Sequence, residues 1–219
     1  MSKKETAKRY ILFIISLFIS AQGVAITKTG DLGVSPISSV ANVMSEKFQI
    51  LTMGNWLIIW NCVLILGQII ILRKNFKLIQ LLQIPVSFLF GYFTDFGMWL
   101  LSYFDFSFYP VRIALVVVGT FVLGFGIALA VIANVIMNSG EAFVKAVADV
   151  TQKKFGNVKI SFDVFCVVFS IVLSLIFFNF SIVGTREGTI IAAFLTGISV
   201  KLFSKPLKNP VEKLLAGKN

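Results

Sequence analysis

Apolar stretches separated by short polar breaks run through the whole chain. Six of these stretches are close to the length of roughly 20 residues that crosses a bilayer. Their runs of Leu, Ile, Val and Phe show no period-two alternation, so the pattern predicts helices and not a β-barrel. Pro85 lies inside the third stretch and predicts a kink there. The six stretches are Tyr10–Thr27, Trp56–Leu72, Leu81–Tyr103, Ile113–Asn134, Val164–Phe180 and Thr189–Phe203.

The chain also contains an internal repeat. Arg9 and Gly23 have the same spacing as Arg112 and Gly126, and the sequence Gly-Val-Ala-Ile at the first glycine is answered by Gly-Ile-Ala-Leu at the second. Each copy holds three apolar stretches, and an odd number inverts the second copy in the membrane. We therefore predict an all-α membrane protein whose six transmembrane helices form two inverted three-helix repeats, in a single transmembrane domain. The repeats cover about 8–106 and 110–205, and a short basic cytoplasmic tail, 206–219, follows.

A short polar segment follows the first apolar stretch of each copy. Gly30, Gly33 and Pro36 disfavour a continuous helix in the first copy, and Ile37–Phe48 is mildly amphipathic. The matching segment in the second copy, Gly140–Gly156, is amphipathic as well. Both segments are too short to cross a membrane. Sequence leaves open whether 35–50 and 139–155 are interrupted or re-entrant elements or surface helices.

Composition and charge agree with a membrane protein. Apolar residues make up 57% of the chain and charged residues only 14%, whereas soluble domains carry about a quarter charged residues. Mean hydropathy is +0.91. The net charge of +10 is explained by loop asymmetry, because cytoplasmic loops collect Lys and Arg. We thus expect a multi-pass protein of the cell (cytoplasmic) membrane with both termini cytoplasmic, its partner the lipid bilayer and not nucleic acid. The outer segments would hold only Lys28, Lys47, Arg112 and Arg186.

The residues offer little for catalysis. The chain has no histidine, which excludes imidazole metal sites, histidine relays and Ser-His catalysis. Cys62 and Cys166 lie in predicted spans without metal-binding spacing, and they are interpreted as packing residues. No nucleophile paired with a base is visible. We therefore expect no enzyme activity, no catalytic or metal-binding residue and no cofactor.

Several motifs together resemble one family. They are Arg9, GVAITKTGDLGVSPISS, Gly54, GEAFVKAVADVTQKKFG, VKISFD and REGTIIAAFLTG, which span nearly the whole chain. They resemble the YczE/YyaS/YitT family of small bacterial membrane proteins. That family often has Pro-Trp-Asp where this chain has Pro36-Ile37-Ser38, and Gly-Val-Gly-Thr at Arg186–Thr189, so no acidic site after Pro36 is implied. The resemblance implies a membrane fold, since the family has no settled biochemical activity.

The leading functional hypothesis is a secondary transporter or permease for a small, unidentified solute. Inverted repeats with interrupted segments at matching places form a binding site at the repeat interface and work by alternating access. Candidate substrate-binding residues are polar groups near that interface, together with Pro36. They are Gln22, Ser35, Pro36, Ser38, Asn55, Asn61, Gln83, Asn134, Asn138, Glu141, Asp163 and Thr189.

Other interpretations stay open. Each amide can instead form a hydrogen bond between helices. The acids Asp95, Glu141 and Asp163 are stronger candidates because intramembrane charges are costly, and Asp163 ranks first, although a helix cap or contact with interfacial water would also explain such acids. Two other functions are considered: a substrate-binding subunit of an energy-coupling-factor transporter, suggested by Ala21-xxx-Ala25, and a non-transporting membrane chaperone or assembly partner. The sequence identifies neither the solute nor the oligomeric state.

Overall fold

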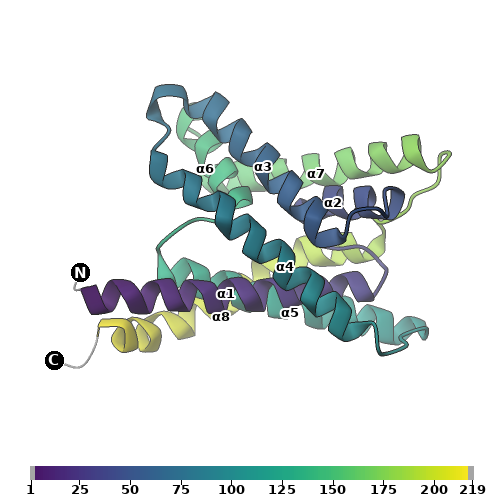
Figure 1. Cartoon of the computed structure of the whole chain (residues 1–219), viewed down its shortest axis with the longest axis horizontal. Helices are drawn as coiled ribbons and strands as arrows, with labels where there is room; N and C mark the ends of the chain where they lie inside the picture. Colours follow the sequence, from purple (N-terminus) through teal and green to yellow (C-terminus); the bar gives the residue numbers. More distant parts are fainter. Residues whose placement is uncertain (1–2, 217–219) are drawn as a thin grey trace.

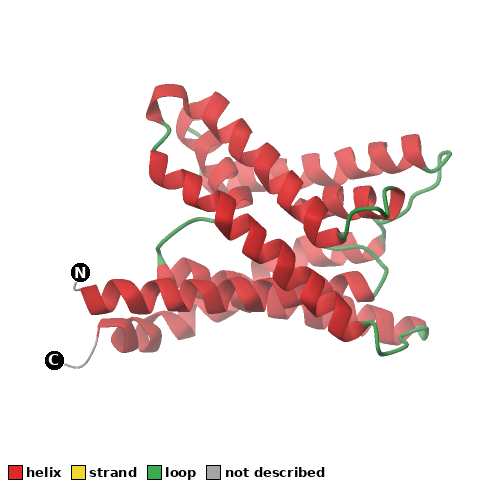
Figure 2. Cartoon of the chain, viewed as in Figure 1, coloured by secondary structure: helices red, strands yellow, loops and turns green. Residues whose placement is uncertain are grey.

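The computed structural model of the chain describes residues 3–216. Over this range the protein is helical, with short connecting loops and two short 3-10 turns (Figures 1 and 2). The eight α-helices are α1 (Lys3–Thr29), α2 (Pro36–Lys47), α3 (Met53–Leu72), α4 (Gln83–Leu101), α5 (Tyr109–Ala133), α6 (Ser139–Thr151), α7 (Phe155–Phe177) and α8 (Glu187–Ala216). The 3-10 turns η1 (Arg73–Asn75) and η2 (Leu78–Leu82) connect α3 to α4.

Six of these helices are long and apolar enough to cross a membrane. They are α1, α3 with η1, η2 with α4, α5, α7 and α8. The remaining helices, α2 and α6, have 12 and 13 residues. The prediction of an all-α membrane protein with six spanning helices is therefore confirmed.

The helix ends differ from the predicted stretches in two informative places. Helix α4 begins at Gln83, so Pro85 lies in its first turn, where a missing N–H costs no helical hydrogen bond. The predicted kink at Pro85 is therefore wrong. Helix α8 continues to Ala216 with Pro206 and Pro210 inside it, so most of the segment predicted as a tail extends the last helix.

Helices α1 and α5 pack against each other in antiparallel directions and approach closely through glycines. A Cβ atom at Gly23 would collide with the backbone nitrogen of Leu123, and one at Gly126 would lie 2.6 Å from the backbone nitrogen of Ser20. Contacts of this kind let two helices pack backbone to backbone in a membrane. The close packing of α1 against α5 therefore depends on two small residues that the sequence repeat also matched.

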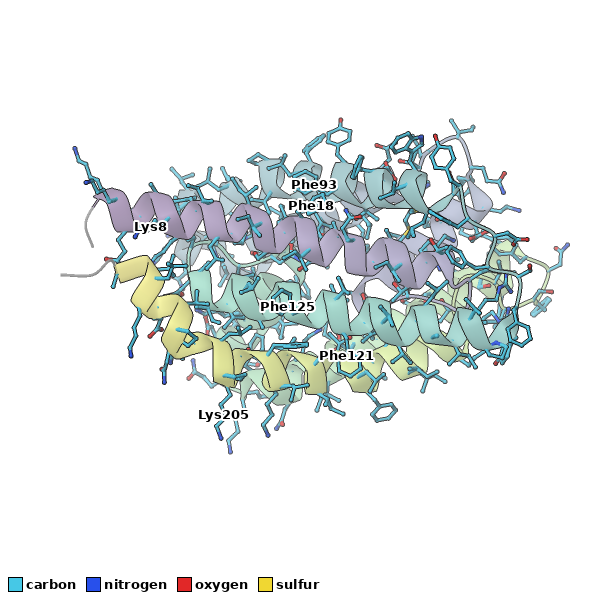
Figure 3. The ribbon with its side chains drawn as sticks, turned by 90° about the horizontal axis from the view of Figure 1, so that it is seen from below. Lys8, Phe18, Phe93, Phe121, Phe125 and Lys205 are labelled. Carbon is cyan, nitrogen blue, oxygen red and sulfur yellow. The ribbon has the colours of Figure 1, made fainter. Side chains whose placement is uncertain are left out.

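Two further long helices pack against this pair in matching ways. Helix α4 packs against α1, and α8 packs against α5. Edge-to-face aromatic pairs strengthen both contacts. Phe18 and Phe93 lie side by side (Figure 3), with ring centroids 5.2 Å apart, and the ring centroids of Phe125 and Phe203 are 5.3 Å apart. The ends of α1 and α8 meet, because Lys8 Nζ donates to the Leu214 carbonyl at 3.0 Å. Both ends of the described chain therefore lie at one end of the molecule, called here the terminal end (Figure 1).

The two short helices are enclosed between α3 and α7. Each of them packs against both of these long helices. The loop before α2 runs toward the middle of the molecule and the helix then turns back, and the loop before α6 does the same from the terminal end (Figures 1 and 2). Their first turns meet, because a Cβ atom at Gly140 would lie 2.8 Å from Ile37 Cδ1. The segments left open by the sequence therefore pack inside the bundle and are not surface helices.

Candidate functional site

A cavity of about 1440 Å³ lies between the two halves of the chain. Each of the eight α-helices contributes to its lining. Asn75, Lys77 and Gln152, which lie in the helix connections at the terminal end, also line it. Among the described residues, none from the loops 48–52, 102–108 and 178–186 at the opposite end lines it. The cavity therefore opens toward the terminal end and is closed toward the other.

One face of α1 forms a wall of this cavity. Phe13, Ser16, Leu17, Ser20 and Val24 recur at the three- and four-residue spacing of a single helical face. The wall is deep, because Val24 stands within the last two turns of α1. The serine hydroxyls of this otherwise apolar wall can form hydrogen bonds with polar groups in the cavity, and they add no charge to the wall.

The first turns of α2 and α6 form the inner part of the cavity. Ser35 Oγ donates to Ser38 Oγ at 3.0 Å, and the side chain of Ser35 makes no capping bond to the α2 backbone. At α6, the Asn138 side chain accepts a hydrogen bond from Ser139 N at 3.1 Å. Ser35, Pro36, Ser38 and Asn138 all line the cavity. The meeting point of the two short helices is therefore part of the site.

A buried amide and hydroxyl network holds the start of α6 in place. Gln68 and Gln83 exchange two hydrogen bonds, at 3.0 and 3.1 Å, which connects α3 to α4. Gln68 also donates to the Ser139 carbonyl at 3.3 Å, and the Ser87 and Ser139 hydroxyls are 3.1 Å apart. Buried polar groups that satisfy one another in this way fix a unique geometry. The network therefore also positions Glu141, which lies two residues after Ser139 in the first turn of α6.

Three charged side chains gather on this wall of the cavity. Lys159 and Asp163 form an ion pair along α7 in the i,i+4 arrangement. Glu141 lies in the first turn of α6, which is not one of the six spanning helices. Burial raises the pKa of the Glu141 carboxyl, the Lys159 ammonium and a backbone hydrogen bond lower it, and the Asp163 charge raises it. The cluster thus combines two carboxylates with one ammonium inside the cavity.

The structure brings most of the candidate site residues together in this cavity. Asp163, which ranked first in the sequence, is there, but Lys159 neutralises it. The candidates that line the cavity are Ser35, Pro36, Ser38, Asn61, Gln83, Asn134, Asn138, Glu141 and Asp163.

The other candidates lie outside it. Gln22 donates to the Phe93 carbonyl at 2.9 Å and so connects α1 to α4, which is the helix-to-helix role weighed against binding. Asn55 stands in the first turn of α3, away from the cavity lining. Thr189 is fully buried against Gly33. Asp95, an acid weighed with them, accepts hydrogen bonds from Thr52 Oγ1 at 2.6 Å and from Gly54 N at 2.8 Å, and therefore caps α3.

Sequence reasoning did not select several lining residues. Lys159 precedes Asp163 by one helical turn, and that spacing was a usable signal for an ion pair. Ser16 and Ser20 are separated by one turn on a single helix face, which was a usable signal as well. Trp60 carried no signal beyond its size, and only the packing of α3 turns it to the cavity.

The sequence of the chain matches the model of a protein family. The model of the family DUF6198, described as a family of unknown function, matches residues 7–205. The chain belongs to this family. No curated protein and no solved structure matches it.

The family match covers both halves of the chain together with the cavity between them. Within residues 3–216 there is no group of three or more His, Cys, Asp and Glu side chains placed to hold a metal ion. The arrangement offers hydroxyls, amides and the carboxylates of Glu141 and Asp149, which take part in no ion pair within the described residues. Such a set suits reversible binding of a small polar molecule.

Proposed function

We propose that the protein is a secondary transporter that moves a small solute across the cell membrane by alternating access. The observation that carries this proposal is the cavity, which lies between the halves and opens at one end only. A transporter of this kind binds solute near the middle of the membrane and exposes the site to one side at a time. A protein with one open and one closed end has the shape of one such state.

The two halves support the required inverted repeat. Each contains a long, a short and two long helices in the same order. The pairing of α1 with α4 is matched by that of α5 with α8, and the pairing of α2 with α7 is matched by that of α6 with α3. A pseudo-two-fold axis in the membrane plane would exchange the two halves, and this exchange would convert each pairing into its match.

Two arginines at matched positions support the same relation. Arg9, near the start of α1, donates to the carbonyls of Ile132 and Ala133 at the end of α5, both at 3.3 Å. Arg112, near the start of α5, donates to Asp31 just after α1 at 3.2 Å. Each arginine thus binds at or beyond the end of the other repeat's first helix, where helix carbonyls favour a cation.

The charge distribution suggests which side the open end faces. Lys and Arg are concentrated at the terminal end, where the cavity opens. Cytoplasmic loops of membrane proteins carry this excess. We therefore assign the terminal end to the cytoplasm and the structure to an inward-open state.

An uptake experiment tests the proposal. Purified protein in liposomes is supplied with a defined mixture of small metabolites, and mass spectrometry identifies those that enter. Gly197 lines the cavity, and a Cβ atom there would meet nothing within 4 Å. A Gly197→Trp variant should therefore fold and fill part of the cavity, and uptake should fall at least about tenfold.

The matched control is Gly197→Ala, which adds only a methyl group and should retain uptake. Thermal unfolding of both variants checks that they are folded. The transport proposal fails if folded wild-type protein takes up no metabolite above the level of empty liposomes. That result would favour the role of an assembly partner.

A further inference from the structure

The charges on the inner wall of the cavity do not cancel. Lys159 and Asp163 form an ion pair, so their charges offset each other. Glu141 takes part in no ion pair within the described residues, although Lys159 and Asp163 are close enough to act on its charge. When all three groups are ionised, the cluster therefore carries one net negative charge. A charge of that kind in an enclosed site is costly unless a cation or a proton offsets it.

We propose that Glu141 is the group through which this protein exchanges a proton with the water of its cavity, and that this exchange couples solute movement to protons. The coupling rests on the transport function proposed above. In the step itself, a hydronium ion of the cavity water loses a proton: one of its O–H bonds breaks, an O–H bond forms on a Glu141 carboxylate oxygen, a water molecule is left, and the cluster becomes neutral. The reverse step returns the proton to water on the side to which the cavity is open.

The location of Glu141 fits such an exchange. It stands in the first turn of α6, one residue after Gly140, which packs against Ile37 at the start of α2. The group therefore lies where the short helices of the two halves meet. A movement of one half against the other would change the surroundings of this point. It would also change the side of the membrane from which water reaches the Glu141 carboxyl.

The surrounding groups favour a proton over a metal ion. Within residues 3–216 no third acid completes a metal-binding group around Glu141. Helix α3, which packs against α6, has no charged residue in Met53–Leu72. A single carboxylate near an ammonium binds metal ions poorly but can still take up a proton. The charged residues that face the cavity with Glu141 are Lys77, Lys145, Asp149, Lys159, Asp163 and Lys201.

The electrostatics agree with the geometry. Burial is the main influence on the Glu141 carboxyl and raises its pKa, and the Asp163 charge raises it further. The Lys159 ammonium and a backbone hydrogen bond act in the opposite direction. Proton exchange is therefore expected at a pH above the range of an exposed glutamate. Glu212, near the end of α8, is exposed and does not line the cavity, so it offers a matched Glu→Gln control.

Infrared spectroscopy of the full-length protein in liposomes tests the assignment without any solute. The probe is the proton, and the signal is the C=O band of a protonated carboxyl during a pH titration. Wild-type protein should show a band that titrates above the ordinary glutamate range. Glu141→Gln should remove this band, and Glu212→Gln should leave it unchanged. A band that persists in Glu141→Gln, or one that is absent from wild type, would overturn the assignment.

Asp163→Asn provides a second, directional test. It removes the charge that raises the Glu141 pKa and leaves Lys159 free to stabilise the Glu141 carboxylate. The midpoint of the Glu141 band should therefore move to lower pH. An unchanged or higher midpoint would show that the three groups do not form one cluster.

Coupling is tested separately from titration. A pH jump across the liposome membrane should produce a transient current in wild-type protein, reduced at least about tenfold in Glu141→Gln and retained in Glu212→Gln. If the infrared band behaves as expected but wild type gives neither a current nor solute uptake, the transport function fails while Glu141 remains a proton site. If solute uptake occurs in wild type and does not respond to a pH gradient, the coupling proposal fails and transport stands.

Discussion

Gly23 of α1 and Gly126 of α5 each lie against the backbone of the opposite helix, at Leu123 and Ser20 respectively. Ser20 precedes Gly23 by the same spacing as Leu123 precedes Gly126. Superposing one half of the chain on the other therefore converts each of these two contacts into the other. A local match between two short sequences thus corresponds to a reciprocal contact between two antiparallel helices, which is the relation expected at a two-fold axis between inverted repeats.

Substitution of either glycine should destabilise the fold. A methyl group at Gly23 or Gly126 would press on backbone atoms, which move less easily than side chains. Overpacking of this kind costs about 1–3 kcal/mol. Gly23→Ala and Gly126→Ala should lower the midpoint of thermal unfolding by several degrees.

Gly197→Ala is the matched control for both glycine variants. A Cβ atom at this helical position meets nothing within 4 Å, so the change should stabilise the protein by about 0.5–1 kcal/mol. Equal effects at all three glycines would contradict the close approach of α1 and α5.

The ion pair of Lys28 with Glu46 should help to keep the closed end closed. This pair connects the end of α1 to α2. The other connection is made by Lys47 of α2, whose Nζ donates to the Phe177 carbonyl of α7 at 2.9 Å. Lys28→Glu places two like charges together and should release α2. A cysteine at Ser38, in protein lacking Cys62 and Cys166, should then react several-fold faster with an impermeant thiol reagent added outside cells.

The charge-exchanged variant, Lys28→Glu with Glu46→Lys, should restore slow labelling at Ser38→Cys. Restoration separates the effect of the ion pair from a general loss of folding. Rapid labelling in the double variant, or slow labelling in the single one, would count against this role of the pair.

The orientation of the protein is tested with two cysteines in the same cysteine-free background. Ser107 lies in the α4–α5 loop at the closed end, and Glu212 lies near the end of α8. Because the terminal end carries most of the Lys and Arg, Ser107→Cys should react with an impermeant reagent in intact cells. Glu212→Cys should react only after permeabilisation, and the opposite pattern would reverse the assigned orientation.

Stability should depend on pH through Glu141. Its pKa is raised by burial in the folded protein, so its stabilising effect is complete below the ordinary glutamate pKa and is lost as pH rises through the folded-state pKa. Glu141→Gln removes this loss. The thermal midpoint of the variant should therefore rise relative to wild type as pH increases, and a constant difference between the two would exclude a perturbed Glu141.

Asp95 offers a contrast between an acid with a structural role and one in the cavity. Its carboxylate accepts bonds from Thr52 and from the backbone of Gly54, and so holds the start of α3 against α4. Asp95→Ala should destabilise the protein by about 1–2 kcal/mol. Uptake by the folded fraction should stay near the wild-type rate, since Asp95 does not line the cavity.

The spanning helices were predictable from sequence because their signal is local. Apolar stretches such as Ile113–Asn134 need only enough length and hydrophobicity, and the bilayer then demands that each backbone satisfy its own hydrogen bonds. Composition alone excluded imidazole chemistry, because the chain has no histidine. The matched spacing of Arg9 to Gly23 and Arg112 to Gly126 pointed to the reciprocal contact between α1 and α5.

The tertiary structure alone decided which polar groups meet. Hydropathy does not specify the rotation of a helix about its axis, which is set by packing against its neighbours. That rotation placed Gln22 against Phe93 and Asn61 in the cavity, although both amides were equal candidates in the sequence. It also placed Glu141 of α6 near the Lys159–Asp163 pair of α7, and Glu141 takes part in no ion pair within the described residues. Whether a buried charge is offset depends on which groups the fold brings within a few ångströms, and a single helix does not contain that information.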